Sequence, residues 1–350
     1  MRIGIVAPPW LAVPPLRYGG VEVMVDVLAV ALREAGHEVL LAASSDSTCA
    51  VTRLPGFAPS DPASMGEGAA ELRHVLAAYR ELIDAGADVI HDHTLIGPHL
   101  APPPVPVVTT IHGPFDAEFA PIVARIPSGV SIVAISRCQA QSMAGVPVRR
   151  VIHHGVDNDR IPFGQGDGGY ACFLGRMDAV KGVRTAIEVA RRADVPLKIA
   201  AKMHDANERD YFATEVEPLL GPSCEFVGEL DAAGKYELLG GAVALVNPLA
   251  WDEPFGMVMI ESLATGTPVL ATPRGSVPEI VDDGVTGFLR ESSADLADAL
   301  AAVGTIDRAA CRSVTAGRFS ARRMAAEYSH LFDEVASDGL RRNRTAAGAR

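Results

Sequence analysis

The chain of 350 residues is poor in lysine and carries an excess of acidic residues. The chain has only four lysines and 27 arginines, and its 43 acidic residues outnumber them to give a formal net charge of −12. A nucleic-acid surface needs clustered cations to neutralise phosphates, and an electrostatic anchor on anionic lipid needs them as well. The composition therefore argues against nucleic acid as a partner and against a basic membrane anchor.

Cysteine is also scarce. Its five positions are odd in number and contain no C-x-x-C pair, which argues against a disulfide framework and against a structural zinc. The chain enters a strand at once with MRIGIVA, and no apolar run reaches the roughly 18 residues that span a bilayer. We therefore expect a cytoplasmic protein with reduced thiols, no signal peptide and no transmembrane segment.

What the chain does contain is a regular alternation of β-rich runs and helical stretches. This alternation predicts parallel sheets with crossover helices, and the length favours two domains. In the first half we expect strands at 2–7, 37–44, 88–93, 106–112 and 131–136, with helices at 21–36 and 71–86. In the second half we expect strands at 170–176, 196–202, 224–230, 241–248 and 267–272, with helices at 183–194, 294–305 and 320–336.

Each half therefore predicts an α/β, doubly wound, Rossmann-like sheet, and the two would face a cleft. We place the first domain at 1–150, a Gly- and Asp-rich linker at 151–168 and the second domain at 169–318. The segment 319–337, which holds the last helix, has no strand after it and would cross back to the first domain. Residues 338–350 are predicted as a flexible tail.

Several unusual residues fall at the carboxyl ends of predicted strands, where open α/β sheets bind ligands. Gly19 and Gly20 precede a helix and would let backbone amides approach an anion, although a plain glycine-rich turn explains them equally well. Arg176 and Lys181 follow a strand and suit a diphosphate, with two solvated loop cations as the alternative. The absence of G-x-G-x-x-G after the first strand argues against a nicotinamide enzyme.

Two further positions are ambiguous. His112 ends the strand PVVTTIH and is either a structural hydrogen bonder or a contact to a ligand. Trp10 follows the first strand, where it would stack on an acceptor or simply pack. The triplet His91-Asp92-His93 does not predict a metal site, because the histidines share a strand face that Asp92 does not and no third ligand has suitable spacing.

The stretch DEPFGMVMIESLATGTPVL (252–270) carries the strongest signal. Pro254 suits a helix start, and the first-turn amides of Phe255, Gly256, Met257 and Val258 would then form an anion site. Glu253 has a plain alternative as a partner of the helix dipole. Glu261 lies among apolar residues, where an ionised carboxylate is costly without a partner, and a ribose diol would supply two donors. Together these features describe a site for a nucleotide sugar.

The motif E-P-F-G-x-x-x-x-E followed by A-x-G-T-P-V resembles the retaining glycosyltransferases of family 4, which have the GT-B fold. Other stretches resemble that family in the same order. They are Y-G-G-V-E near the N-terminus, VIHDH at 89–93, H-x-G-x-D around 154–157, F-L-G-R-x-x-x-x-K-G at 173–182, F-V-G-E-L at 226–230 and the run from G-S-V-P-E to T-G-F-L at 275–289.

The resemblance implies a role for each matching residue. Arg176 and Lys181 would hold the donor diphosphate, Glu253 would contact the donor sugar and Glu261 the ribose. Further donor contacts are implied for Gly19, Gly20, Leu230, Lys235 and the residues Phe255, Gly256, Met257 and Val258. His112 would contact the sugar, and the catalytic set is Glu253, His112, Arg176 and Lys181. The N-terminal domain would bind the acceptor, with Trp10 as a candidate contact.

The implied reaction moves a sugar from a nucleotide-diphosphate sugar, with UDP favoured, to an acceptor hydroxyl with retention of configuration. No Asp-x-Asp motif is placed to hold a metal on the diphosphate, so we expect no metal and no other cofactor. The acceptor is expected to be a soluble small molecule or glycan. The alternatives are a GT-B nucleotide-sugar 2-epimerase or phosphorylase, or a non-catalytic sugar-nucleotide-binding protein.

Overall fold

The computed structural model describes residues 1–100 and 104–348 of the chain. It divides into two compact units. Unit 1 comprises Met1–Pro15, Gly19–Gly155 and Ala321–Arg350, and unit 2 comprises Leu16–Tyr18 and Val156–Ser320.

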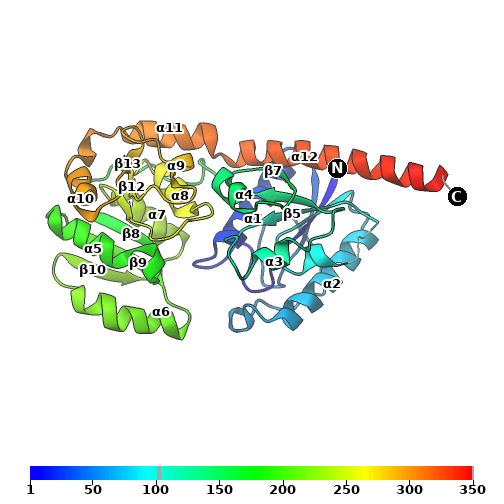
Figure 1. Cartoon of the computed structure of the whole chain (residues 1–350), viewed down its shortest axis with the longest axis horizontal. Helices are drawn as coiled ribbons and strands as arrows, with labels where there is room; N and C mark the ends of the chain where they lie inside the picture. Colours follow the sequence, from blue (N-terminus) through cyan, green and yellow to red (C-terminus); the bar gives the residue numbers. More distant parts are fainter. Residues whose placement is uncertain (101–103, 349–350) are drawn as a thin grey trace. The chain divides into compact units, whose positions relative to one another are not determined.

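Unit 1 is built on a parallel seven-stranded sheet with the order β3-β2-β1-β4-β5-β6-β7. Strands β5 and β7 of this sheet are labelled in Figure 1. The strands are β1 Arg2–Val6, β2 Glu38–Ala42, β3 Thr52–Arg53, β4 Val89–Asp92, β5 Val107–Ile111, β6 Ser131–Ala134 and β7 Val148–Val151. The helices are α1 Gly20–Glu34, α2 Gly68–Asp84, α3 Ala120–Val123, α4 Arg137–Ser142 and α12 Ala321–Gly348. The sequence did not predict β3 or β7, because β3 has only two residues and half of β7 is arginine (VRRV).

Helix α12 belongs to the core of unit 1. Its Tyr328 and Phe332 are fully buried in a cluster with apolar residues of β1, α1 and β2. The helix continues to Gly348, so the flexible tail predicted from residue 338 is helical as far as the structure describes it. Leu, Arg and Ala have high helix propensity, and the stretch DGLRRNRTAAG is rich in them, which allows the helix to propagate.

Unit 2 contains a second parallel sheet, of six strands, with the order β10-β9-β8-β11-β12-β13. The strands are β8 Ala171–Arg176, β9 Leu197–Lys202, β10 Cys224–Gly228, β11 Leu245–Asn247, β12 Val269–Ala271 and β13 Gly287–Leu289. The helices are α5 Val183–Arg192, α6 Ala206–Tyr211, α7 Ala232–Gly241, α8 Met257–Ala264, α9 Val277–Ile280, α10 Ser293–Ala301 and α11 Arg308–Arg318. The sequence predicted five of these strands and missed the short β13. Both halves thus have the predicted Rossmann-like architecture.

The helix predicted to start at Pro254 begins three residues later, at Met257. Gly256 precedes it with φ of +86°, a left-handed conformation that is incompatible with the helix. Pro254, Phe255 and Gly256 therefore form a loop. The amides of Met257 and Val258, which lack acceptors within the helix, lie at the first turn of α8.

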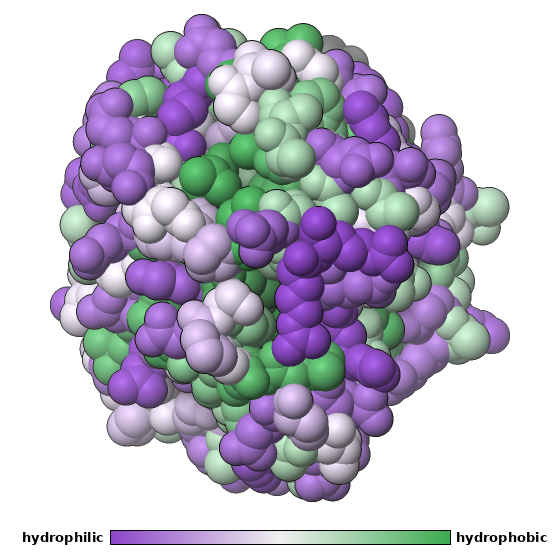
Figure 2. Space-filling view, turned by 90° about the vertical axis from the view of Figure 1, so that its left-hand side faces the viewer, coloured by the Kyte–Doolittle hydropathy of each residue, from purple (hydrophilic) through white to green (hydrophobic). Residues whose placement is uncertain are grey.

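The surface drawn in Figure 2 is mostly hydrophilic, with hydrophobic residues showing between the hydrophilic ones. Within the part of the chain that the structure describes, no helix is both long enough and apolar enough to cross a membrane.

Candidate functional site

The first ion pair of unit 2 lies beyond the carboxyl ends of β8 and β11. Lys181, in the 3-10 turn η3 (Ala179–Lys181), donates from Nζ to Glu253 Oε2 at 2.5 Å. The indole Nε1 of Trp251 donates to the same carboxylate oxygen at 3.0 Å, and Lys181 Nζ lies 4.6 Å from the centre of that ring. Both ionic side chains are about six-sevenths buried, with 13% and 14% exposed. One oxygen of Glu253 therefore accepts from two donors.

The second ion pair joins α7 to α8. Lys235 Nζ lies 2.5 Å from Glu261 Oε1, and the Glu261 side chain is only 7% exposed. The lysine compensates the cost of burying an ionised carboxylate in this apolar helix. Asp231 caps α7 by accepting from the amide of Gly234, which fixes the start of the helix that carries Lys235.

The loop that carries Glu253 is clamped by the segment before α9. Ser276 donates from its amide to the carbonyl of Glu253 at 2.9 Å and from its hydroxyl to the carbonyl of Phe255 at 2.6 Å. Gly275 has φ of +59°, and a Cβ there would lie 2.3 Å from the backbone nitrogen of Glu253. Only glycine allows this close approach, so a side chain at position 275 would push the Glu253 loop away.

Arg176 ends β8 and faces two carboxylates. Its Nη2 lies 3.5 Å from Asp178, and its Nη1 lies 3.8 Å from Glu208, a buried residue of α6. Lys202 ends β9 directly opposite Arg176 in the strand register and is 8% exposed. The sequence did not single out Lys202 or Glu208. Lys202 could have been found from the sequence, because it is one of only four lysines and ends a predicted strand.

The remaining predicted residues are placed as follows. Leu230 follows β10 and is half-buried. Gly19 is buried at the N-cap of α1, whereas Gly20 is exposed as its first residue. A Cβ on Gly20 would meet nothing within 4 Å, so packing does not require glycine there. Trp10 is half-buried in the loop after β1. The donor-binding roles of Leu230, Gly19 and Gly20 and the acceptor-binding role of Trp10 remain predictions.

Unit 1 contains a histidine cluster that the sequence did not predict. His93 Nδ1 and His112 Nε2 share a hydrogen bond of 2.9 Å. The ring of His91 lies 4.0 Å from that of His93, and the ring of His154 stacks on His112 at 5.3 Å. The strand register brings β4 beside β5, which is why residues 19 positions apart meet. Within residues 1–100 and 104–348, no group of three or more His, Cys, Asp or Glu could hold a metal ion.

Burial keeps these histidines neutral. It lowers the pKa of His91 to about 3 and that of His112 to about 4, and it lowers the pKa of His93 and of His154 well below 6.5. Burial also raises the pKa of the Asp92 carboxyl to about 6. The imidazoles therefore act as neutral hydrogen-bonding groups at pH 7.

We expect unit 1 to lose stability when the pH falls from 7 to 5. In that range the unfolded histidines, with a pKa near 6.5, bind protons that the folded ones reject, so protonation favours the unfolded state. Asp92 has the opposite effect on stability, because its pKa is about 6 in the folded state and 3.8 in the unfolded state. This single carboxyl does not outweigh the four buried histidines. A urea titration at both pH values should show a lower midpoint at pH 5. An equal or higher midpoint would contradict this assignment.

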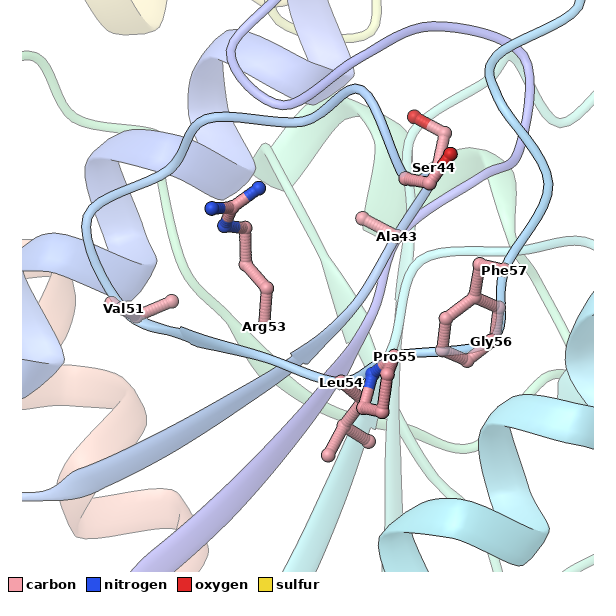
Figure 3. Close-up of a pocket in the computed structure, with 9 residues that line it drawn as sticks. Ala43, Ser44, Val51, Arg53, Leu54, Pro55, Gly56 and Phe57 are labelled. Atoms are coloured by element: carbon pink, nitrogen blue, oxygen red, sulfur yellow. The ribbon is translucent and has the colours of Figure 1, made fainter.

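A separate cavity of about 300 Å³ lies beyond the carboxyl ends of β2 and β3 in unit 1 (Figure 3). Ser44, Arg53 and Phe57 contribute to its wall. None of the predicted site residues lines it. The candidate site, which we place at the two ion pairs of unit 2, is therefore distinct from this cavity.

Two family models match the chain in succession. The model described as Glycosyltransferase Family 4 matches residues 18–160, and the model described as Glycosyl transferases group 1 matches residues 157–311. The second match contains both ion pairs. The chain is therefore a glycosyltransferase in which a family 4 domain is followed by a group 1 domain.

Named relatives match this glycosyltransferase over most or nearly all of its length. The phosphatidyl-myo-inositol mannosyltransferase of Mycobacterium leprae is 27% identical, with 97% of this chain and 98% of that protein covered. The glycogen synthase of Mycobacterium tuberculosis is also 27% identical, with 78% of this chain and 79% of that protein covered.

Solved structures share the GT-B fold with this glycosyltransferase. The sucrose-phosphate synthase from Thermosynechococcus elongatus has a TM-score of 0.79 at 19% identity, with 96% of this chain and 99% of that one covered. The Anabaena protein HepE, solved in complex with UDP-glucose, has a TM-score of 0.72 at 17% identity, with 95% and 100% covered.

Proposed function

We propose that this glycosyltransferase moves a sugar from a nucleotide-diphosphate sugar to an acceptor hydroxyl, with retention of configuration and without a metal. The observation that carries the proposal is the pair of buried lysine–glutamate contacts at α8 and the loop before it. One lies at the loop before the helix, at Glu253, and the other in the helix, at Glu261. The two carboxylates and the amides between them match the sugar, diphosphate and ribose of one donor.

In this proposal the diphosphate binds at the amides of Met257 and Val258 and at the cations Arg176 and Lys181. The positive end of α8 attracts the phosphate charge. Lys181 then exchanges part of its contact with Glu253 for the phosphate, and Glu253 becomes available to the donor sugar. Arg176 and Lys181 stabilise the charge that builds on the leaving nucleotide, so positioning and electrostatics carry the catalysis.

Retention follows from the side of attack. The acceptor hydroxyl approaches the anomeric carbon from the face on which the diphosphate departs, and a phosphate oxygen takes its proton. The new bond then has the configuration of the old one. Measuring the anomeric configuration of the product by NMR tests this step, and an inverted product would contradict it.

We propose a UDP-sugar as donor, supported by the UDP-glucose complex of the Anabaena protein with the same fold. A screen of UDP, GDP, ADP and dTDP by thermal denaturation tests the nucleotide site. A specific nucleotide stabilises the folded state by about 2.7 kcal/mol at a hundredfold excess over its dissociation constant. UDP should raise the transition temperature most. If none of the four changes it, the nucleotide-sugar proposal is wrong.

We expect transfer to survive removal of divalent cations. Arg176, Lys181 and the α8 amides supply the positive charge that a metal provides in other sugar-nucleotide enzymes. Rates should therefore be equal before and after exhaustive EDTA treatment and dialysis. Loss of activity that Mg²⁺ or Mn²⁺ restores would refute metal-independent transfer.

We propose that unit 1 binds the acceptor and that the acceptor is soluble. Residues 1–150 contain ten arginines, no lysine and 14 acidic residues, a balance that does not favour an anionic lipid surface. The name of the mycobacterial mannosyltransferase points to a lipid acceptor for that protein. Comparing transfer to free inositol, to glycans and to vesicles that contain phosphatidylinositol decides between these classes.

A further inference from the structure

We propose that His93 is a positioning residue that fixes the tautomer of His112, so that His112 presents an Nδ1–H donor to the donor sugar. This inference rests on the proposed function, because it assigns a chemical state to a predicted sugar contact. It concerns the residues of unit 1 alone.

The hydrogen bond between the two rings uses one nitrogen of each. His93 Nδ1 and His112 Nε2 lie 2.9 Å apart, and both rings are neutral at pH 7 because of their burial. A neutral imidazole carries one N–H and one lone pair. One ring must therefore donate and the other accept, which leaves two arrangements of the protons.

The other nitrogen of His93 decides between them. His93 is 5% exposed, and its Nε2 is buried without a hydrogen-bond partner among the described residues. A buried N–H without an acceptor is rarer in proteins than a buried acceptor without a donor. The proton of His93 therefore resides on Nδ1, and His93 donates to His112 Nε2.

It follows that His112 carries its proton on Nδ1. Its Nε2 accepts from His93, so Nδ1–H is the one donor that the neutral ring offers. His112 is only partly buried, and stacking on His154 restrains the orientation of the ring. The ring is thus prepared to donate to a sugar hydroxyl oxygen, and it does not offer a lone pair to that hydroxyl.

Nitrogen NMR on protein labelled with ¹⁵N-histidine tests the assignment without any substrate. The His112 signals are identified by their loss in His112→Gln. Near pH 7 the wild-type enzyme should show His112 with Nδ1 protonated and Nε2 bare. A His112 ring protonated on Nε2 would overturn the proposal, whether or not the enzyme transfers sugar.

Variants of His93 supply the second readout. His93→Asn keeps an N–H donor close to the place of Nδ1 and should preserve both the tautomer and kcat/KM. His93→Leu removes the donor, so His112 should populate both tautomers and kcat/KM should fall about tenfold, the effect of losing one neutral hydrogen bond. His91→Gln is the matched control, because it replaces a buried imidazole of the same cluster that does not contact His112 through a hydrogen bond. It should leave the His112 tautomer unchanged.

The outcomes separate the two proposals. If the tautomer follows His93 as expected but no sugar is transferred, the proposed function fails and the positioning role of His93 stands. If transfer occurs but His93→Leu leaves the tautomer and kcat/KM unchanged, the positioning role is wrong. Should His93→Leu fail to fold, the wild-type spectrum and His93→Asn still decide.

Discussion

Replacing Lys181 with methionine should lower kcat/KM for sugar transfer by about a hundredfold to a thousandfold. This is the cost of removing one group that stabilises transition-state charge. Methionine keeps the length and the packing of the side chain but cannot neutralise phosphate. The change also leaves Glu253 with only the Trp251 N–H as a partner. Steady-state kinetics with the nucleotide sugar identified by the thermal screen measures the effect.

The matched control is Lys198→Met. Lys198 lies in the first half of β9, and its Nζ is 4.2 Å from the centre of the Tyr170 ring, outside the two ion pairs. This substitution removes the same charge from the same unit and should leave kcat/KM unchanged. Equal losses in the two variants would mean that net charge, and not the Lys181 contact, governs catalysis.

Replacing Glu261 with alanine should weaken binding of the nucleoside diphosphate by about tenfold to a hundredfold, since a hydrogen bond to a charged group contributes about 1.5–3 kcal/mol. Replacing Glu253 with glutamine should instead lower kcat and leave nucleotide affinity nearly unchanged, because that carboxylate is assigned to the sugar. Titration calorimetry gives the affinities, and initial rates give kcat. The reverse pattern would mean that the donor lies in the opposite direction along α8.

Glu261→Ala also frees Lys235, whose ammonium group would then lack its carboxylate. The double variant Lys235→Ala, Glu261→Ala separates this effect from loss of the ribose contact. We expect the double variant to bind nucleotide no more tightly than Glu261→Ala, because Lys235 is itself an implied donor contact. Restored affinity in the double variant would show that the unpaired lysine, and not the missing ribose contact, caused the loss.

The sequence by itself determined the architecture and the residue types of the site. Alternating strands and helices are local patterns of hydrophobicity, and they predicted two parallel α/β sheets without reference to any contact. The carboxyl ends of those strands can also be located from the local sequence. Arg176 and Lys181 lie at one such end and were therefore recognisable as candidate site residues. Glu261 was recognisable because a lone carboxylate in an apolar helix needs a partner.

Only the tertiary structure decided which partners these residues have. Lys181 and Glu253 are 72 positions apart, and Lys235 and Glu261 are 26 apart. The pairing of His93 with His112 depends on β4 lying beside β5 in one register. Strand order is a property of the whole sheet, because the hydrophobic pattern of one strand fixes which of its faces is buried but not which strand lies beside it. The helix start at Met257 was likewise set by the close approach of a distant loop, which holds residues 253–256 out of the helix.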